Sequence, residues 1–281
     1  MSARCVHLAL LLALAPLAAA CGSVGLGSTR SGDPVANAAT KTGTTTSMRI
    51  VFRGTVWGPW ADETVSFAGH GIADTAAGTG RLHFHFNFPP AVRAALGQNP
   101  SVDMIMRSKP NLVMYMRSPL LAKVAPASKP WLKLNLTRYA AQKGIDLNGL
   151  SQLDQTDPSQ NLKYLMAASK SRELGWDRVR GGTLTKHYAL TINLRKLAKD
   201  DAAFRAAMKQ LPGFATRIPA QAWVDDRGFL RKLSLRLSLG KSPDGPVRMK
   251  LSEEFYGFGV ATNIKAPPAR FVTDAAKLLN R

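Results

Sequence analysis

Apolar and polar residues alternate along much of the chain after Met48, which predicts strands with one buried and one solvated face. In segment 81–88 the polar residues share one face, and the other face carries Leu82, Phe84, Phe86 and Phe88. Two alternating runs flank the turn 108–111 and predict a hairpin. We expect roughly nine to eleven strands in all, since such runs recur to the end of the chain. The other runs lie at 102–106, 112–116, 132–136, 184–194, 218–224, 233–239 and 247–251.

Short turns join most of these strands, which favours a single antiparallel sheet that is curled or closed. Three helices are expected beside it, near 157–169, 197–210 and 273–280. The first begins with Asp157 at the N-cap and Pro158 at N1. No internal repeat is visible, so we predict one α+β domain over residues 48–281.

The N-terminus predicts an export signal that ends at a cysteine. Arg4 precedes an apolar run at 6–17, and three alanines lead to Cys21, as in a secretory signal with its cleavage site. That run is shorter than the roughly 20 residues that a bilayer-spanning helix needs. Segment 17–21, Leu-Ala-Ala-Ala-Cys, resembles a bacterial lipobox, in which diacylglycerol is attached to the cysteine. The alternative is a cleaved signal followed by an unmodified cysteine.

We therefore expect residues 1–20 to be a signal peptide and Cys21 to carry acyl chains such as palmitate. Cys21 would be the only cysteine of the mature chain, which suits acylation better than a disulfide. The protein would be exported and anchored by lipid to the outer face of the cytoplasmic membrane. Residues 22–47 are mostly Gly, Ser, Thr and Ala, so 21–47 is predicted to be the lipidated N-terminus and a flexible tether.

The chain is strongly basic, with 38 Lys and Arg against 18 Asp and Glu and a net charge of +20. Such a charge attracts the anionic headgroups of a membrane surface. A merely well-solvated surface is the alternative. Export and the lack of a recognition motif disfavour nucleic acid as a partner.

The chain lacks the common signatures of catalysis: a Gly-x-Ser-x-Gly elbow, a His-Glu-x-x-His helix, a zinc-binding cysteine pair and a Walker-type loop. The glycine-rich pieces 69–71 and 78–80 predict turns or strand kinks. Acids 225–226 lie in a turn, and acids 253–254 point to opposite faces of a strand, so neither pair converges on one site. We predict no enzymatic activity and no cofactor.

Two histidines on one strand face are the remaining candidate for metal chemistry. His83 and His85 could meet one ion, with His70 or an acid as a third ligand. The alternative, which we favour, is a polar outer face opposite the apolar one. We therefore predict no metal site.

A set of aromatic and methionine side chains suggests an apolar binding surface. Phe84, Phe86 and Phe88 share one strand face, and the predicted hairpin carries Met104, Met106, Met114 and Met116. Met and Phe surfaces adapt to floppy apolar ligands. By composition alone an ordinary core is favoured, but a curled sheet with a helix across its mouth can leave a cavity.

Six short segments follow one another along the second half of the chain. They are Lys-Pro-Trp-Leu-Lys-Leu at 129–134, the Asp157-Pro158 helix start, Val-Arg-Gly-Gly-Thr-x-Thr-x-His-Tyr at 179–188, Ala-Trp-Val-Asp-Asp-Arg-Gly at 222–228, Tyr-Gly-Phe-Gly-Val at 256–260 and Ile-Lys-Ala-Pro-Pro at 264–268. In this order they resemble segments of the mycobacterial LppX/LprG-type lipoproteins. The resemblance implies a half-barrel of antiparallel strands with helices on its concave face, as in the LolA/LolB lipoprotein carriers. Such proteins hold acylated lipids or glycolipids in an apolar cavity and help to move them across the envelope. The resemblance brings no catalytic residues.

Together these features predict a monomeric, membrane-anchored lipoprotein that binds an acylated lipid or glycolipid and passes it to an envelope transport partner. One alternative is a non-carrier with a filled core that serves as a structural or protein-interaction module, and another is an enzyme using His83 and His85. Charged residues at Leu165 or Phe86 are predicted to abolish lipid loading while the fold survives. The side chains expected to line the cavity are Phe84, Phe86, Phe88, Met104, Met106, Leu132, Leu134, Leu162, Leu165, Met166, Tyr188, Leu190, Leu235 and Leu237.

Overall fold

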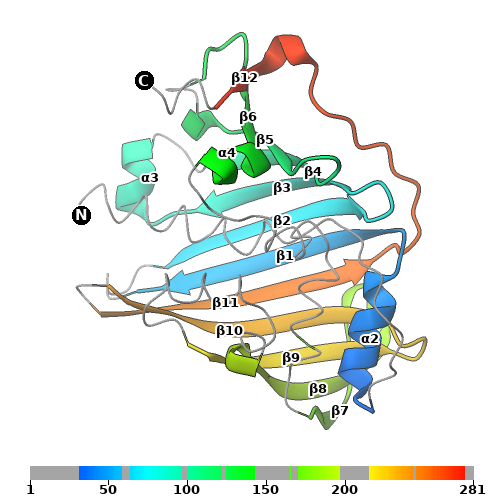
Figure 1. Ribbon diagram of the computed structural model, residues 1–281. Coiled ribbons are helices and arrows are strands. Elements are labelled where there is room, and N and C mark those ends of the chain that lie inside the picture. Colours follow the sequence, from blue (N-terminus) through cyan, green and yellow to red (C-terminus); the bar gives the residue numbers. More distant parts are fainter. Residues whose placement is uncertain are drawn as a thin grey trace.

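A computed structural model describes residues 32–58, 64–96, 100–121, 125–142, 165, 170–196, 215–242 and 245–275. In these residues a sheet of 12 strands forms the body of the molecule (Figure 1). The strands are β1 (Ser47–Trp57), β2 (Val65–Asp74), β3 (Thr79–Asn87), β4 (Ser101–Arg107), β5 (Val113–Arg117), β6 (Trp131–Asn135), β7 (Arg172–Arg178), β8 (Leu184–Asn193), β9 (Arg217–Asp225), β10 (Leu230–Ser242), β11 (Gly245–Tyr256) and β12 (Val272–Asp274). The helices are α2 (Pro34–Gly43), α3 (Pro90–Leu96) and α4 (Leu136–Gln142), with 3₁₀ turns η2 (Pro119–Leu121), η3 (Arg180–Gly182) and η4 (Ala269–Phe271).

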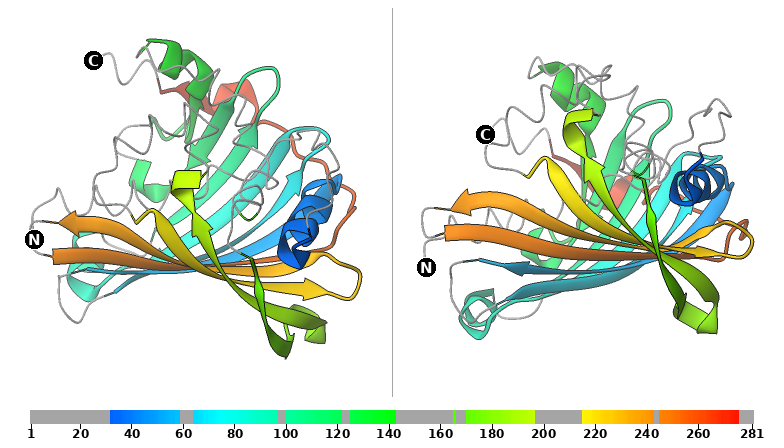
Figure 2. Two further views of the ribbon diagram at one scale, coloured as in Figure 1. Left: turned by 60° about the horizontal axis from the view of Figure 1, so that its bottom comes forward. Right: turned by 90° about the horizontal axis from the view of Figure 1, so that it is seen from below.

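The strand order is β12-β6-β5-β4-β3-β2-β1-β11-β10-β9-β8-β7. The chain therefore meanders outward from β1 to β6 and later returns from β7 to β11, which pairs with β1 at the centre. Every neighbouring pair is antiparallel except β12 with β6, which is parallel. In the described chain no pairing joins β12 to β7, so the curled sheet stays open as a half-barrel (Figure 2).

The predicted fold class is confirmed, and most predicted strands coincide with observed ones. The turn 108–111 connects β4 to β5, and the turn after Asp225 connects β9 to β10. The sheet has more strands than expected because β7 is exposed almost throughout and β12 has only three residues. Neither carries the alternation that reveals a half-buried strand.

The core lies on one face of the sheet, which we call the inner face. Alternate residues of the strands place large side chains there, including Phe52, Phe84, Phe86, Met104 and Met106, each at most 2% exposed. Neighbouring rings pack in tilted contacts, with 5.2 Å between the centroids of Phe52 and Phe84. Each such side chain contributes roughly 1.5–3 kcal/mol by leaving water.

Glycines in β1 and β2 make room for these rings. A Cβ on Gly54 would lie 2.1 Å from Cζ of Phe67, and one on Gly69 would lie 2.4 Å from Cζ of Phe52. Each ring thus covers a neighbouring strand at the place where a side chain is missing. The glycine-rich piece 69–71 accordingly lies within β2.

Helix α2 corrects the prediction of a flexible tether over residues 21–47. Residues 34–43 form a helix that contacts β9 and β10 and buries Val35, Ala38 and Ala39 in the core cluster (Figure 1). Asp33 caps it, because Oδ1 accepts hydrogen bonds from the backbone N–H groups of Val35 and Ala36 at 2.9 and 3.2 Å. The folded domain therefore includes Asp33 onward rather than beginning at residue 48.

Two further boundaries differ from the prediction. Leu136 begins α4 instead of ending a strand, because Oδ1 of Asn135 accepts a hydrogen bond from the N–H of Arg138 at 2.9 Å and caps the helix. Residues 273–274, expected in a helix, pair with β6 as part of β12.

The predicted helices near 157–169 and 197–210 lie outside the described residues, apart from Leu165. Among the helices that are described, none combines the length and hydropathy needed to cross a bilayer.

Candidate functional site

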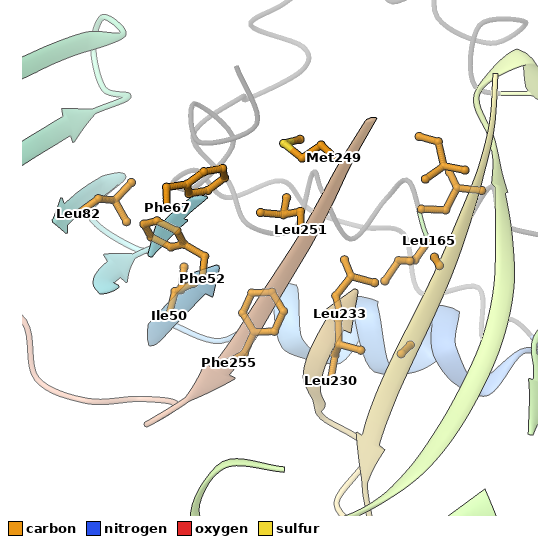
Figure 3. Packing of buried hydrophobic residues seen from close by; sticks show 14 of the residues in the cluster. Ile50, Phe52, Phe67, Leu82, Leu165, Leu230, Leu233, Met249, Leu251 and Phe255 are labelled. Carbon is orange, nitrogen blue, oxygen red and sulfur yellow. The ribbon is translucent and has the colours of Figure 1, made fainter. Parts of the chain in front are cut away.

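The inner face is the candidate ligand-binding surface. It is apolar from β6 through the central pair β1 and β11 to β8. In each pair of neighbouring strands the register places the apolar residues of one strand opposite the apolar residues of the next. Figure 3 shows the central part, where Phe52, Phe255, Leu233 and Leu251 come from three adjacent strands and gather on one side. Leu165 belongs to the same buried cluster and is 2% exposed.

Most of the residues predicted to line a cavity are buried, on the inner face or, for Leu165, in the core cluster against it. They are Phe84, Phe86, Phe88, Met104, Met106, Leu132, Leu165, Tyr188 and Leu190. Leu134, Leu235 and Leu237 also lie on the inner face but keep accessible surface. Cys21, Leu162 and Met166 lie outside the described residues.

A second group of inner-face side chains is only partly buried, and we call these the accessible apolar residues. They pack against the core yet retain surface that a ligand could cover. One set lies at or beside β5 and the other on β10. They are Leu112, Met114, Met116, Leu235, Leu237 and Leu239.

One carboxyl interrupts the inner face, at Glu253 in β11. Its register partners are Phe52 on β1 and Leu233 on β10, so its side chain emerges among apolar neighbours. Burial raises the pKa of Glu253 to about 7. The adjacent Glu254 points to the outer face, where Oε2 accepts a hydrogen bond from Nε of Arg180 at 2.7 Å.

Residues 253 and 254 point to opposite faces, as predicted, but the carboxyl of Glu253 on the apolar face was not predicted. The sequence does indicate this orientation, because Glu253 follows Val247, Met249 and Leu251 and precedes Phe255 at every second position, where the other residues are apolar. A charged residue at such a position is unusual unless it is paired or functional.

The outer face carries a basic hollow of about 710 Å³ at the end of β9, β10, β11 and β1. Its charged lining residues are Arg217, Arg236, Arg248 and Lys250, all exposed, and Trp57 lies beside them. Within the described parts of the chain, none of these four cations forms an ion pair with an acid. The hollow can therefore receive an anionic group. Its cations come from three consecutive strands, β9, β10 and β11, and the antiparallel register places Arg236 directly opposite Lys250.

On the outer face, His83 belongs to a cross-strand ion cluster. His83 Nδ1 lies 2.9 Å from Oδ1 of Asp103, whose Oδ2 accepts a 2.7 Å hydrogen bond from Nη2 of Arg117. Burial alone would raise the pKa of Asp103, but the bonds and charges of His83 and Arg117 hold it below its usual value. His85 is exposed on the same strand. In the described chain no three His, Cys, Asp or Glu side chains gather as a metal site.

Comparisons with known proteins give only distant likenesses. No family model matches the chain, and no curated protein matches it. LprF from Mycobacterium bovis superposes with a TM-score of 0.45 at 11% identity, covering 83% of this chain and 95% of that one. A DUF1329 family protein from Desulfovibrio piger ATCC 29098 gives 0.30 at 11%, covering 82% and 95%. MucB in complex with MucA(peri) gives 0.30 at 12%, covering 84% and 58%. Likenesses at such TM-scores carry no argument about function.

Proposed function

We propose that the chain is an exported lipoprotein, anchored through acyl chains on Cys21, that binds an acylated lipid or glycolipid on its inner face. It would help to move that lipid through the cell envelope and pass it to a transport partner. The observation that carries the proposal is the accessible apolar residues on an otherwise buried apolar sheet face. This role needs no catalysis and no cofactor.

Burial of an acyl chain would supply the affinity. A chain that removes roughly 300 Å² of apolar surface from water gains about 7 kcal/mol before the cost of ordering. Met114 and Met116 suit such a ligand because the thioether side chain adapts to irregular shapes.

The position of α2 limits how far the domain could stand from its anchor. From Cys21 to Asp33 there are 33 − 21 = 12 residue steps, which span at most about 43 Å when fully extended. The domain would therefore stay close to the membrane surface to which Cys21 holds it.

The basic hollow is the proposed contact with anionic headgroups of that membrane. Its four cations, which pair with no acid of the described chain, attract phosphate groups, each by about 1 kcal/mol near a charged bilayer. Trp57, which is 41% exposed beside them, is a side chain favoured at the membrane–water interface. The inner face would thus load lipid while the outer face holds the domain in place.

Native mass spectrometry of the protein with Cys21→Ser, purified from a bacterial envelope without detergent, tests the proposal. We expect a bound species of lipid mass that organic extraction removes. The neighbours Leu235 and Arg236 give a matched pair, since they face inward and outward on the same strand. Leu235→Asp should lose bound lipid and keep its binding to anionic vesicles, whereas Arg236→Asp should do the reverse. A protein that stays free of lipid after exposure to glycolipid would refute the lipid-binding role.

A second candidate function is a protein-interaction module, favoured by the exposed edge strand β7. Trp176 is 58% exposed there, and Leu174 and Leu184 are 41% and 46% exposed. β7 is the last strand of the sheet order, so its outer edge could pair with a strand of a partner protein. This reading predicts a lipid-free protein whose binding to an isolated partner is lost in Trp176→Ala.

A further inference from the structure

Glu253 is, among the described residues, the one charged side chain at the centre of the inner face. In register it lies between Phe52 and Leu233, and Leu251 and Phe255 flank it on the same strand. These four neighbours are each at most 3% exposed. Glu253 itself keeps more accessible surface than any of them, so it borders space that its neighbours do not reach.

No described residue forms a hydrogen bond or an ion pair with the side chain of Glu253. On the described elements packed nearby, the charged groups are engaged elsewhere or lie on the other face. On β1 and β11, Arg53 and Glu254 pair on the outer side. On β10, the ammonium group of Lys232 lies over the ring of Trp223 on the outer face, and Arg231 pairs with Asp225 at the β9–β10 hairpin. On α2, Lys41 Nζ donates to the carbonyl oxygen of Arg227, and Asp33 caps the helix.

A carboxyl without a partner in an apolar surround is costly, and such groups are kept mainly where they serve a ligand. The apolar surround favours its neutral form, which is a hydrogen-bond donor. The polar atoms that an acylated lipid brings into an apolar site are the carbonyl oxygens at the head of its chains, and these are acceptors. The two groups complement each other.

We propose that the neutral carboxyl of Glu253 donates a hydrogen bond to the ester or amide carbonyl oxygen of a bound acyl lipid and so fixes the head of the chain on the inner face. The inference rests on the proposed lipid binding and names the chemical group that this site selects. Ionisation of Glu253 removes the donor and places a negative charge beside the carbonyl oxygen. The bond is therefore made in acid and lost in base, with the change centred near pH 7.

Two short-chain lipids that differ only in this carbonyl provide the test. Dihexanoyl phosphatidylcholine carries two ester carbonyls, and its di-O-hexyl ether analogue has none. Binding of each to the Cys21→Ser protein is measured by calorimetry at pH 5.5 and 8.5, below the concentration at which the lipids form micelles. The wild-type site should prefer the ester by roughly 2–10-fold at pH 5.5, the worth of one neutral hydrogen bond. The preference should largely vanish at pH 8.5.

Two variants separate this bond from the general apolar affinity. Glu253→Gln keeps a donor at every pH, so it should retain the ester preference at both. Glu253→Leu removes the donor but keeps the volume and apolar character of the face, so it should bind both lipids equally. An ester preference that survives in Glu253→Leu, or one that does not change with pH in the wild type, overturns the inference while lipid binding stands. Failure of the wild type to bind either lipid overturns the proposed function itself.

Discussion

Asp33 provides a direct test of whether the N-terminal segment is part of the folded domain. Its Oδ1 caps α2, and its Oδ2 accepts a 2.6 Å hydrogen bond from the N–H of Ser171, just before β7. One side chain thus joins residues 138 positions apart in the sequence. Asp33→Ala removes both roles at once.

The expected loss follows from these contacts. Loss of an N-cap costs about 1 kcal/mol, and a hydrogen bond to a charged acceptor is worth about 1.5–3 kcal/mol. Together they predict a loss of roughly 2–4 kcal/mol in the free energy of unfolding, or roughly 4–16 °C in Tm for a domain of this size. Asp33→Asn should lose less, because its amide oxygen can still cap the helix.

The assay is urea unfolding of wild type, Asp33→Ala, Asp33→Asn and a control, followed by circular dichroism. Asp226→Ala is a matched control, since Asp226 is an exposed acid in the β9–β10 turn. The control should lie within about 0.5 kcal/mol of wild type. If Asp33→Ala is as stable as the control, α2 is not held as described, and the segment behaves as the tether that the sequence predicted.

Three other perturbations have defined outcomes. Gly54→Ala should destabilise the protein by about 1–3 kcal/mol in urea unfolding, because its Cβ would meet the Phe67 ring, and the loss should shrink in a Phe67→Leu background. Asp103→Asn should make the stability less sensitive to acid. The pKa of Asp103 is lowered in the folded protein, so its carboxylate stabilises the fold above pH 3.8, and this contribution is lost as the pH falls through the lowered pKa. Between pH 5 and pH 2.5, Tm should therefore fall less in the variant than in the wild type. Glu253→Gln should raise stability at pH 8 by roughly 2–4 kcal/mol but little at pH 4, because the raised pKa of Glu253 makes its stabilising effect complete below 4.5 and lost as pH rises through about 7. Equal gains at both pH values would contradict the last of these.

The sheet was predictable because a half-buried strand shows its alternation directly in the sequence. In β3 the residues of one face are aromatic or aliphatic and those of the other are basic or amide, so both its position and its buried face follow. Strand order was not predictable in this way. The pairing of β1 with β11 joins residues about 200 positions apart, and the sequence of neither strand indicates which strand it pairs with.

Helix α2 was missed although its signals resemble those of the helix predicted at Asp157. Asp33 and Pro34 form the same N-cap and N1 pair, and Val35, Ala38, Ala39 and Thr42 recur at helical spacing. Small side chains hid the pattern, because alanine and threonine lower the apparent hydrophobicity of the buried face. Small residues also let the helix approach the sheet closely, where Oγ1 of Thr42 accepts a 2.9 Å hydrogen bond from the N–H of Leu230.

The burial of the predicted cavity residues changes which variants can test lipid binding. Phe86 and Leu165 are 1% and 2% exposed, so a charge at either position would enter the core without a partner. That costs several kcal/mol, enough to unfold a domain of ordinary stability. We therefore expect such variants to unfold, unlike the expectation from the sequence that they keep the fold, and loss of lipid in them would not distinguish a ligand contact from unfolding. Leu235 and Leu237 avoid the problem, because their accessible surface lets a charged side chain remain solvated when no lipid is bound.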